Sequence, residues 1–263
     1  MSFREMKKVQ LDSLQVIHDF CEVNNIKYSL GCGSLLGAVR HKGYIPWDDD
    51  IDIYLLREEY VKLITKFPHE LNFVSINSLE RNDDWNYAYA KAYDTRTYMV
   101  ETSVIDKPLG VNIDIFPLDN APGIDSGWQL FNYKRKFLQN IYYAKFMRLD
   151  KHRNYLKLAG QIMVKVLASP YSLRQMALFL DRYSQQFNKM DTKYVFENIQ
   201  GLHLKYPFEK NSMAEMVDMP FEDRVFKCMV GYDDYLKNAY GDYMKLPPIE
   251  KQVSHHFFVP YWR

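Results

Sequence analysis

The stretch GYIPWDDDIDIYLL, residues 43–56, places four aspartates within five positions and then continues into a run of apolar residues. Carboxylates this close repel one another by roughly 1 to 4 kcal/mol per pair, depending on how well water screens them. The alternation predicts a β-strand over 50–56 in which Asp50 and Asp52 point the same way, about 6.5–7 Å apart along the strand, while the intervening isoleucines point to the core. We therefore expect these carboxylates to serve a purpose other than solubility.

A second acidic position lies downstream in VNIDIFPLD, residues 111–119, where Asp114 stands between two isoleucines. A single Asp in a buried strand must be paired, hydrogen-bonded or bound to a metal ion. If this strand lies beside the first, Asp114 joins Asp50 and Asp52 in a three-carboxylate cluster. Oxygen ligands of this kind suit Mg²⁺, or Mn²⁺ as an alternative.

A glycine-serine turn precedes the acidic run. In GCGSLLG, residues 31–37, a short predicted strand ends and a helix begins. The N–H groups at such a helix N-terminus bind anions, so Gly33 and Ser34 are candidate phosphate-binding residues. Any strand-to-helix turn produces this glycine pattern, but an acidic pair follows Ser34 closely. Phosphate beside a divalent cation is typical of a phosphoryl or nucleotidyl transfer site.

Three basic residues are further candidates for phosphate contacts. Arg40 and His41 follow the predicted phosphate turn on the same helix, and Lys91 stands in the alternating segment NYAYAKAY, residues 86–93. Each has a plainer alternative. Arg40 is equally well explained as a surface arginine, and Lys91 as the partner of a site aspartate rather than of substrate phosphate.

Other polar residues are expected to have structural roles. We expect Asp49 and Asp119 to cap helices or to pair with Lys or Arg. His41 together with His255 and His256 raises the question of zinc, but no further ligands stand at useful spacing.

Composition excludes several classes of protein. The 263 residues carry a net charge of +1, so the uniform positive field of a nucleic-acid-binding protein is missing and we expect no nucleic-acid partner. The three cysteines form no CxxC pair, which favours a reducing, cytoplasmic setting. The most apolar stretch, 156–168, contains two lysines and is shorter than the roughly 20 residues that span a bilayer. We expect a cytoplasmic protein with, at most, peripheral contact with the inner face of a membrane.

Hydrophobic periodicity predicts an α/β (α+β) fold: a mixed sheet core with flanking helices and an added helical layer. We expect a core over 1–120, a helical region over 121–193 and a C-terminal segment, 194–263, that closes on the core. The expected helices are 5–23, 34–41, 57–67, 126–149, 154–168, 171–189 and 232–240. The expected strands are 26–30, 50–56, 72–77, 86–93, 97–101 and 110–116.

Residues 128–148 interleave basic and aromatic side chains. We expect this helix to pack on its neighbours with a solvated basic face. The alternatives are a peripheral contact with a membrane or a polymer and, less favoured, stacking on nucleic-acid bases.

Four sequence blocks together resemble the LicD family. They are GSLLGAVRHKGYIPWDDDIDI (33–53), KAYDT (91–95), VNIDIFPLD (111–119) and YDDYLKNAYGDYMKLPP (232–248). The resemblance covers roughly 25–120 and 220–256 and leaves 121–219 unmatched. That family belongs to the nucleotidyltransferase-fold superfamily, whose signature is a Gly-Ser turn, an Asp-x-Asp strand and a third Asp on a neighbouring strand. The matching residues here are Gly33, Ser34, Asp50, Asp52 and Asp114.

The resemblance implies a nucleotidyltransferase-like core and a phosphotransferase activity. Family members are similar to enzymes that move a phosphorylated small alcohol, often phosphocholine, from a CDP-linked donor such as CDP-choline to a hydroxyl group, with release of CMP. The acceptor would be a surface glycan or lipid-linked polysaccharide, such as lipopolysaccharide, teichoic acid or capsule. Distant fukutin-type relatives leave CDP-alditols open as donors.

The resemblance also implies roles for the acidic residues. Asp50, Asp52 and Asp114 would be the catalytic residues and would hold one or two Mg²⁺ ions. Asp114 is the expected acceptor of the proton of the attacking hydroxyl. Two alternatives stay open: a nucleotidyltransferase that uses an NTP and releases pyrophosphate, and a non-catalytic binding protein of the same fold.

Overall fold

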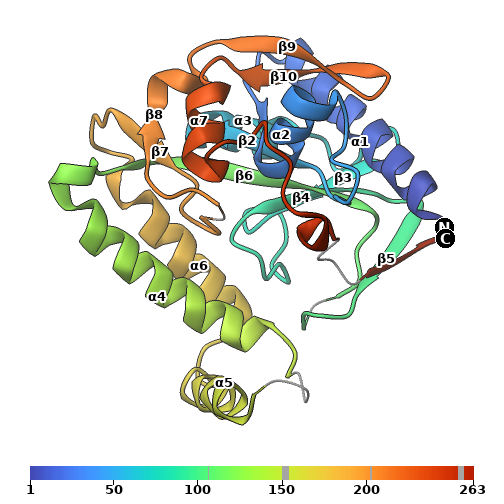
Figure 1. Ribbon diagram of the computed structural model, residues 1–263. Helices are drawn as coiled ribbons and strands as arrows, with labels where there is room; N and C mark the ends of the chain where they lie inside the picture. Colours follow the sequence, from blue (N-terminus) through green and yellow to red (C-terminus); the bar gives the residue numbers. More distant parts are fainter. Residues whose placement is uncertain (106, 150–153, 202, 254–257) are drawn as a thin grey trace.

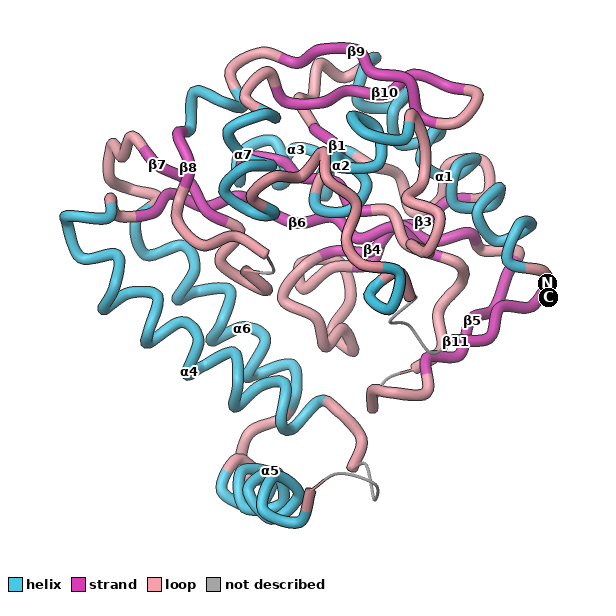
Figure 2. Tube along the Cα trace, viewed as in Figure 1, coloured by secondary structure: helices cyan, strands magenta, loops and turns pink. Residues whose placement is uncertain are grey.

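The computed structural model describes residues 1–105, 107–149, 154–201, 203–253 and 258–263 (Figures 1 and 2). His255 and His256 therefore lie outside the described residues. The helices are α1 (Phe3–Val23), α2 (Cys32–His41), α3 (Arg57–Lys66), α4 (Gln129–Phe146), α5 (Tyr155–Leu167), α6 (Leu173–Ser184) and α7 (Tyr232–Tyr240). The strands are β1 (Ser29–Leu30), β2 (Asp52–Leu56), β3 (Val74–Asn77), β4 (Ala90–Asp94), β5 (Thr97–Glu101), β6 (Asn112–Ala121), β7 (Tyr194–Phe196), β8 (Phe208–Glu209), β9 (Met216–Phe221), β10 (Arg224–Met229) and β11 (Phe258–Trp262).

A mixed sheet forms the centre of the molecule and confirms the predicted α+β class. Its main order is β1-β2-β6-β4-β3, and β7 and β8 extend it from the far end of β6. Strands β2 and β6 run parallel, whereas the other pairs in the sheet are antiparallel. Both central strands are almost continuously buried, which is why their sequences are apolar runs interrupted by few polar residues, aspartates and asparagines.

The first helix shows how local sequence sets an element. Ser2 and Glu5 form a reciprocal capping box that begins α1. Apolar residues at helical spacing, among them Leu14, Ile17 and Cys21, are fully buried on its inner face. The capping box and the apolar stripe therefore fix the start of the helix and the side that packs on the sheet.

The helical layer consists mainly of α4 and α6, which lie side by side at one edge of the sheet, while α5 projects beyond their ends (Figures 1 and 2). Phe131 of α4 and Tyr183 of α6 stack with ring centroids 5.2 Å apart, and the Tyr183 hydroxyl donates to the Phe131 carbonyl. These contacts confirm that helices follow the sheet after residue 126, as predicted.

Several strand boundaries differ from the sequence prediction: the strands expected from residues 26, 72 and 110 begin two or three residues later, and three larger differences lie near the centre of the sheet. The strand expected over 86–93 begins only at Ala90. Before it, backbone carbonyls accept hydrogen bonds from side chains instead of from a neighbouring strand: the Tyr142 hydroxyl donates to Asn86 O, and the Trp85 indole donates to Tyr89 O. The strand expected to end at residue 116 continues to Ala121, where it pairs with β7. The third difference concerns β2 and the acidic loop.

Strand β2 begins at Asp52, so Asp50 lies in the preceding loop and the prediction that a strand carries both residues is wrong. The Asp49 carbonyl, which would otherwise join the ladder, accepts a hydrogen bond from the buried Gln10 side chain of α1. Ile51 and Ile53 are nevertheless fully buried, as expected.

Candidate active site

The sheet register brings two acidic residues and one basic residue together. Asp52 on β2 is paired in register with Asp114 on β6, and Asp114 is paired with Lys91 on β4. The Lys91 Nζ donates to Asp114 Oδ1 at 2.6 Å and to Asn112 Oδ1 at 3.2 Å. Lys91 is thus paired with a site aspartate, one of the two partners that the sequence leaves open, and its contact with substrate phosphate stays a prediction.

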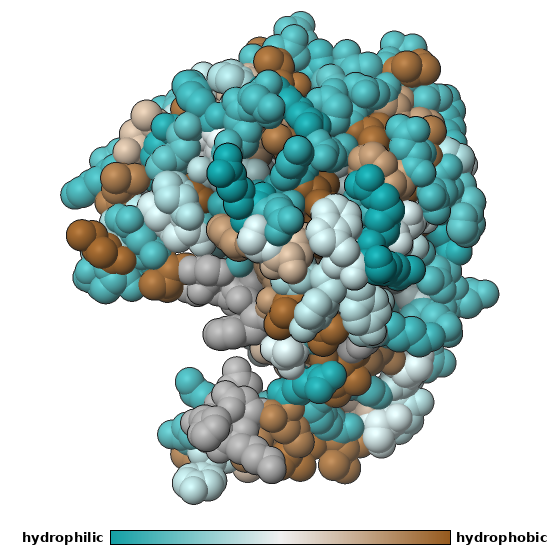
Figure 3. Space-filling model, turned by 90° about the vertical axis from the view of Figure 1, so that its right-hand side faces the viewer, coloured by the Kyte–Doolittle hydropathy of each residue, from teal (hydrophilic) through white to brown (hydrophobic). Residues whose placement is uncertain are grey.

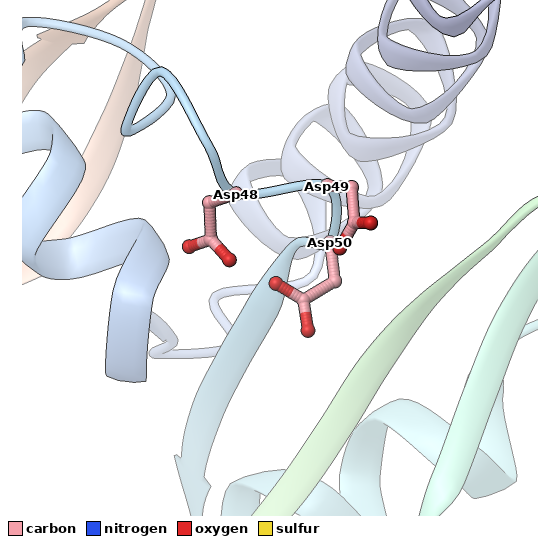
Figure 4. A group of neighbouring side chains, drawn as sticks. All are labelled: Asp48, Asp49 and Asp50. Carbon is pink, nitrogen blue, oxygen red and sulfur yellow. The ribbon is translucent and has the colours of Figure 1, made fainter. Parts of the chain in front are cut away.

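Asp50 belongs to an acidic loop, Asp48–Asp50, that leads into β2 (Figure 4). One carboxylate oxygen of each of its three aspartates lies within 4.8 Å of the others. The Asp114 backbone N–H donates to Ile51 O at 2.9 Å, and the Gln10 amide bridges Asp49 O and Asn112 O. The loop is thus held directly against the strand that carries Asp114.

The glycine-serine turn supports the acidic residues from the other side. Helix α2 begins there, and the Ser34 hydroxyl accepts the Asp52 backbone N–H at 3.0 Å. A Cβ placed on Gly33 would collide with the Asp48 carboxylate, so only glycine lets Asp48 lie against the first turn of α2. The positive end of a helix dipole favours a carboxylate at this place. The expected role of Gly33 and Ser34 as phosphate contacts stays a prediction.

Arg40 and His41 lie at the opposite end of α2. The Arg40 guanidinium donates to the Tyr243 carbonyl at 2.7 Å and to the His41 ring at 2.9 Å. Neither residue is in the wall of the cavity that contains Asp52 and Asp114. Their expected contact with phosphate also stays a prediction.

Electrostatics within the site are strongly unfavourable for a set of bare carboxylates. Burial, followed by the negative charges of Asp50 and Asp114, raises the pKa of the Asp52 carboxyl well above its usual range. Burial alone would lower the pKa of Lys91, but Asp114 and Glu101 reverse this effect and the Lys91 pKa is raised. Lys91 offsets part of the negative charge around Asp114 and Asp52, and Lys7 acts on the acidic loop. A divalent cation would further relieve the repulsion around Asp52.

A cavity of about 330 Å³ opens over these residues. Asp50, Asp52, Asp114 and Lys91 line one part of it. Another part is aromatic, and the rings come from Tyr87, Tyr89, Phe116, Tyr143, Phe146 and Phe258. Lys91 Nζ lies 5.0 Å from the Tyr87 ring centroid and 5.5 Å from that of Tyr89, so two rings already face one cation.

Several residues of the cavity were not singled out from the sequence. From the sequence, Asp49 is expected to cap a helix or to pair with Lys or Arg. In the structure it is buried and lines the cavity together with Gln10, Glu101 and Glu197. Asp119, by contrast, forms the expected pair with an arginine, Arg57. The one signal in the sequence for Asp49 was its place inside the acidic run. Gln10 and Glu197 stand in segments far from it.

Comparison with known proteins places this arrangement in a class. Residues 25–151 match the family model described as LicD/FKTN/FKRP, nucleotidyltransferase domain. The chain is 32% identical over 261 residues to the lipopolysaccharide cholinephosphotransferase LicD of Haemophilus influenzae, covering 97% of this chain and 96% of that protein. A shorter similarity, 52% over 46 residues, relates it to the uncharacterized protein RP689 of Rickettsia prowazekii and covers 18% of this chain and 17% of that protein.

The protein therefore belongs to the class of proteins that carry a nucleotidyltransferase domain of the LicD/FKTN/FKRP type. Because the similarity to the Haemophilus protein extends over nearly all of both chains, this protein belongs to the LicD family. The similarity also covers residues 121–219, which the sequence motifs alone left unmatched.

Proposed function

We propose that this protein is a cholinephosphotransferase that moves phosphocholine from CDP-choline to a hydroxyl of a lipopolysaccharide-type glycan and releases CMP. The observation that carries the proposal is one cavity in which Asp50, Asp52, Asp114 and Lys91 face a wall of aromatic rings. The name of the Haemophilus relative, a lipopolysaccharide cholinephosphotransferase, supports the same chemistry.

The acidic residues offer only oxygen atoms, which are the preferred ligands of a hard cation such as Mg²⁺. Asp50, Asp52 and Asp114 would hold the ion, since all three line the cavity. Among the described residues, the carboxylates whose oxygens lie within 4.8 Å of one another are those of Asp48, Asp49 and Asp50, so Asp50 is common to both sets. Burial, and then the charges of Asp50 and Asp114, raise the pKa of Asp52, and a cation bound beside it would favour its charged form. When bound, Mg²⁺ would supply charge stabilisation on the pyrophosphate oxygens of the donor.

Asp114 is the residue best placed to accept the proton of the acceptor hydroxyl. Its carboxylate lies in the cavity and receives a hydrogen bond from Lys91 at one oxygen, Oδ1. That contact orients the carboxylate, while Oδ2 is the oxygen we assign to the proton. The nearby Ser34–Asp52 hydrogen bond holds the neighbouring strand in register with it. Positioning of this kind supplies much of the rate in phosphoryl transfer.

The aromatic wall suits the choline end of the donor. A quaternary ammonium group cannot donate hydrogen bonds and is recognised by the faces of aromatic rings and by nearby negative charge. Tyr143 and Phe146 of α4 contribute rings to this wall, and Glu101 and Glu197 contribute carboxyl groups. An uncharged alditol donor would gain nothing from these contacts.

Product analysis with the purified protein tests the proposal. We expect CMP to form from CDP-choline and a glycan acceptor, and the reaction to require Mg²⁺. Release of pyrophosphate from an NTP would instead identify a nucleotidyltransferase, and turnover that persists in EDTA would remove the metal from the proposal.

A matched pair of variants tests the aromatic wall. Tyr143→Leu removes a ring and is expected to lower kcat/KM for CDP-choline about tenfold, which corresponds to the 1–2 kcal/mol typical of a cation–π contact. Tyr143→Phe keeps the ring and is expected to retain most of the activity. Equal losses in both variants would show that the hydroxyl, not the ring, is what matters.

We infer the cellular location of the protein from the place where its proposed donor would be available, and not from a membrane-spanning helix. None of the described helices has the length and apolar character needed to cross a bilayer. We propose that the protein works on the cytoplasmic side, where a CDP-linked donor would be available, on an acceptor carried at the inner face of the membrane.

A further inference from the structure

Helix α5 is attached to the molecule by its polar side. Among its residues only Gln161 is buried, and the Gln161 amide donates to the carbonyls of Ala144 and Met147, at 3.3 Å each. Lys165 Nζ donates to Lys145 O at 2.7 Å and to Met147 O at 2.8 Å. These contacts satisfy carbonyls at the C-terminal end of α4 that the helix itself leaves without partners.

The apolar side of α5 faces outward. The exposed fractions are Tyr155 87%, Leu156 84%, Ile162 44%, Met163 59%, Val166 64% and Leu167 71%. At 3.6 residues per turn these six side chains fall within an arc of about 140°, so they form one continuous stripe. Figure 3 shows hydrophobic atoms gathered on the protruding lobe at the bottom of the molecule, the region that α5 occupies in Figure 1.

Further exposed apolar side chains lie on α4. Leu130, Tyr133 and Phe137 are 62%, 72% and 58% exposed and stand at i, i+3 and i+7 on that helix. Phe137 also lines an apolar groove of about 480 Å³ between α4 and α5, together with Ile141 and Val164. An amphipathic helix of a globular protein normally buries its apolar stripe. The reversed orientation of α5 therefore indicates a partner that covers it.

The charge of this region indicates what kind of partner. Residues 125–181 contain ten Lys or Arg residues and three Asp residues, whereas the whole chain has a net charge of +1. Of the basic residues, Arg135 is buried and Arg174 is paired with Asp83. Lys134, Lys136 and Lys157 are exposed close to the apolar stripe in the sequence. A surface that is both apolar and strongly basic is complementary to an anionic lipid bilayer.

We propose that α5, together with the exposed apolar residues of α4, docks on the surface of an anionic phospholipid bilayer. The 13 residues of α5 extend about 20 Å, which is shorter than the roughly 30 Å hydrocarbon core, so the helix lies along the surface and does not cross it. A second copy of the chain is a poorer occupant, because it would bring two positively charged surfaces into contact.

The docking surface adjoins the candidate active site. Tyr143 of α4 lines both the α4–α5 groove and the aromatic part of the cavity. Docking through α5 would therefore hold the cavity near the membrane, where a lipid-borne acceptor would be found. The inference itself rests on burial and charge and does not depend on the proposed chemistry.

Vesicle flotation with the full-length protein tests this inference. We expect the protein to float with vesicles of phosphatidylcholine mixed with phosphatidylglycerol, to float far less with phosphatidylcholine alone, and to be released by high salt. Leu156→Glu/Val166→Glu places two carboxylates in the stripe at exposed positions. We expect it to lower the partition coefficient for anionic vesicles by about tenfold or more.

The matched control is Val23→Glu, at the end of α1, where the side chain is 82% exposed and lies outside the stripe. It adds a negative charge and is expected to leave flotation close to the wild-type level. Circular dichroism melting curves should be the same for all three proteins, since none of the altered side chains is buried.

Three outcomes would overturn the inference. They are no flotation of the wild-type protein, equal flotation of the wild type and the stripe variant, and a concentration-dependent dimer in sedimentation velocity that the stripe substitutions abolish. The last result would assign the stripe to a second copy. Because flotation needs no donor and no turnover, an inactive protein that floats would refute the proposed function alone.

Discussion

At the scale of single residues, the site consists of buried charges with different partners. Asp114 is held by Lys91, a lysine whose side chain is almost fully buried. Asp119, five residues further along β6, is held by Arg57 through two hydrogen bonds of 2.7 and 2.6 Å. Asp52 forms no ion pair among the described residues, and although the charge of Lys91 acts to lower its pKa, burial raises that pKa overall. An aspartate of this sheet can thus be held in an ion pair, as Asp119 is, or lie where burial disfavours its charged form, as Asp52 does.

This contrast predicts opposite effects for two matched substitutions. Asp52→Asn removes a charge that its surroundings disfavour, so we expect a higher free energy of unfolding in EDTA, by about 1 kcal/mol or more, and a loss of transfer activity of about a hundredfold or more. Asp119→Asn breaks a buried ion pair and is expected to cost about 3 kcal/mol.

Urea unfolding in EDTA and an assay of CMP release measure both effects. If Asp52→Asn is destabilising to the same extent as Asp119→Asn, Asp52 is a structural residue and its assignment to the active site fails.

At the scale of secondary-structure elements, Arg57 joins three of them. It stands at the start of α3, pairs with Asp119 on β6, and its Nη1 lies 3.0 Å from Asp181 Oδ1 on α6, in a geometry that does not form a hydrogen bond. Burial is the largest cause that raises the pKa of Asp181, to about 6. The charged form of Asp181 is therefore disfavoured in the folded protein.

The raised pKa of Asp181 determines how the free energy of unfolding changes with pH. Because the folded protein binds the Asp181 proton more tightly than the unfolded chain, this group contributes stability below about pH 4 and loses that contribution as the pH rises through about 6. Asp181→Asn resembles the protonated form. We expect it to match the wild type at pH 4 and to be about 2 kcal/mol more stable at pH 7.

Urea unfolding of both proteins across this pH range is the measurement. The exposed Asp83, which also faces an arginine, gives a control at which Asp→Asn should change the free energy of unfolding little at any pH. A wild-type protein that gains stability relative to Asp181→Asn as the pH rises would contradict the prediction.

At the scale of the whole molecule, the cavity is assembled from distant parts of the chain. Gln10 comes from α1, Lys91 from β4, Phe146 from α4 and Phe258 from β11, and all of them line it. A single main core cluster runs from α1 to α7. A ligand that binds the cavity should therefore stabilise the molecule against unfolding as a whole.

Thermal unfolding with added ligands checks this expectation. We expect CDP-choline to raise Tm by several degrees in the presence of Mg²⁺ and little in EDTA, because in the proposed function the carboxylates would bind the donor through the metal. CDP-ethanolamine, CDP-glycerol and CDP-ribitol are expected to produce smaller shifts. A CDP-glycerol shift as large as that of CDP-choline would contradict the assignment of the aromatic wall to the ammonium group.

Local sequence is enough to predict the apolar strands, the amphipathic helices and the acidic positions, because periodicity and like-charge crowding are local properties of a chain. Asp52, Asp114 and Lys91 are recognisable for this reason. The folded structure was needed to show that β2 and β6 are parallel neighbours in register, that Lys91 pairs with Asp114, and that α5 turns its apolar side outward. Strand pairing and helix orientation depend on contacts between segments tens to hundreds of residues apart, and a local pattern carries no information about them.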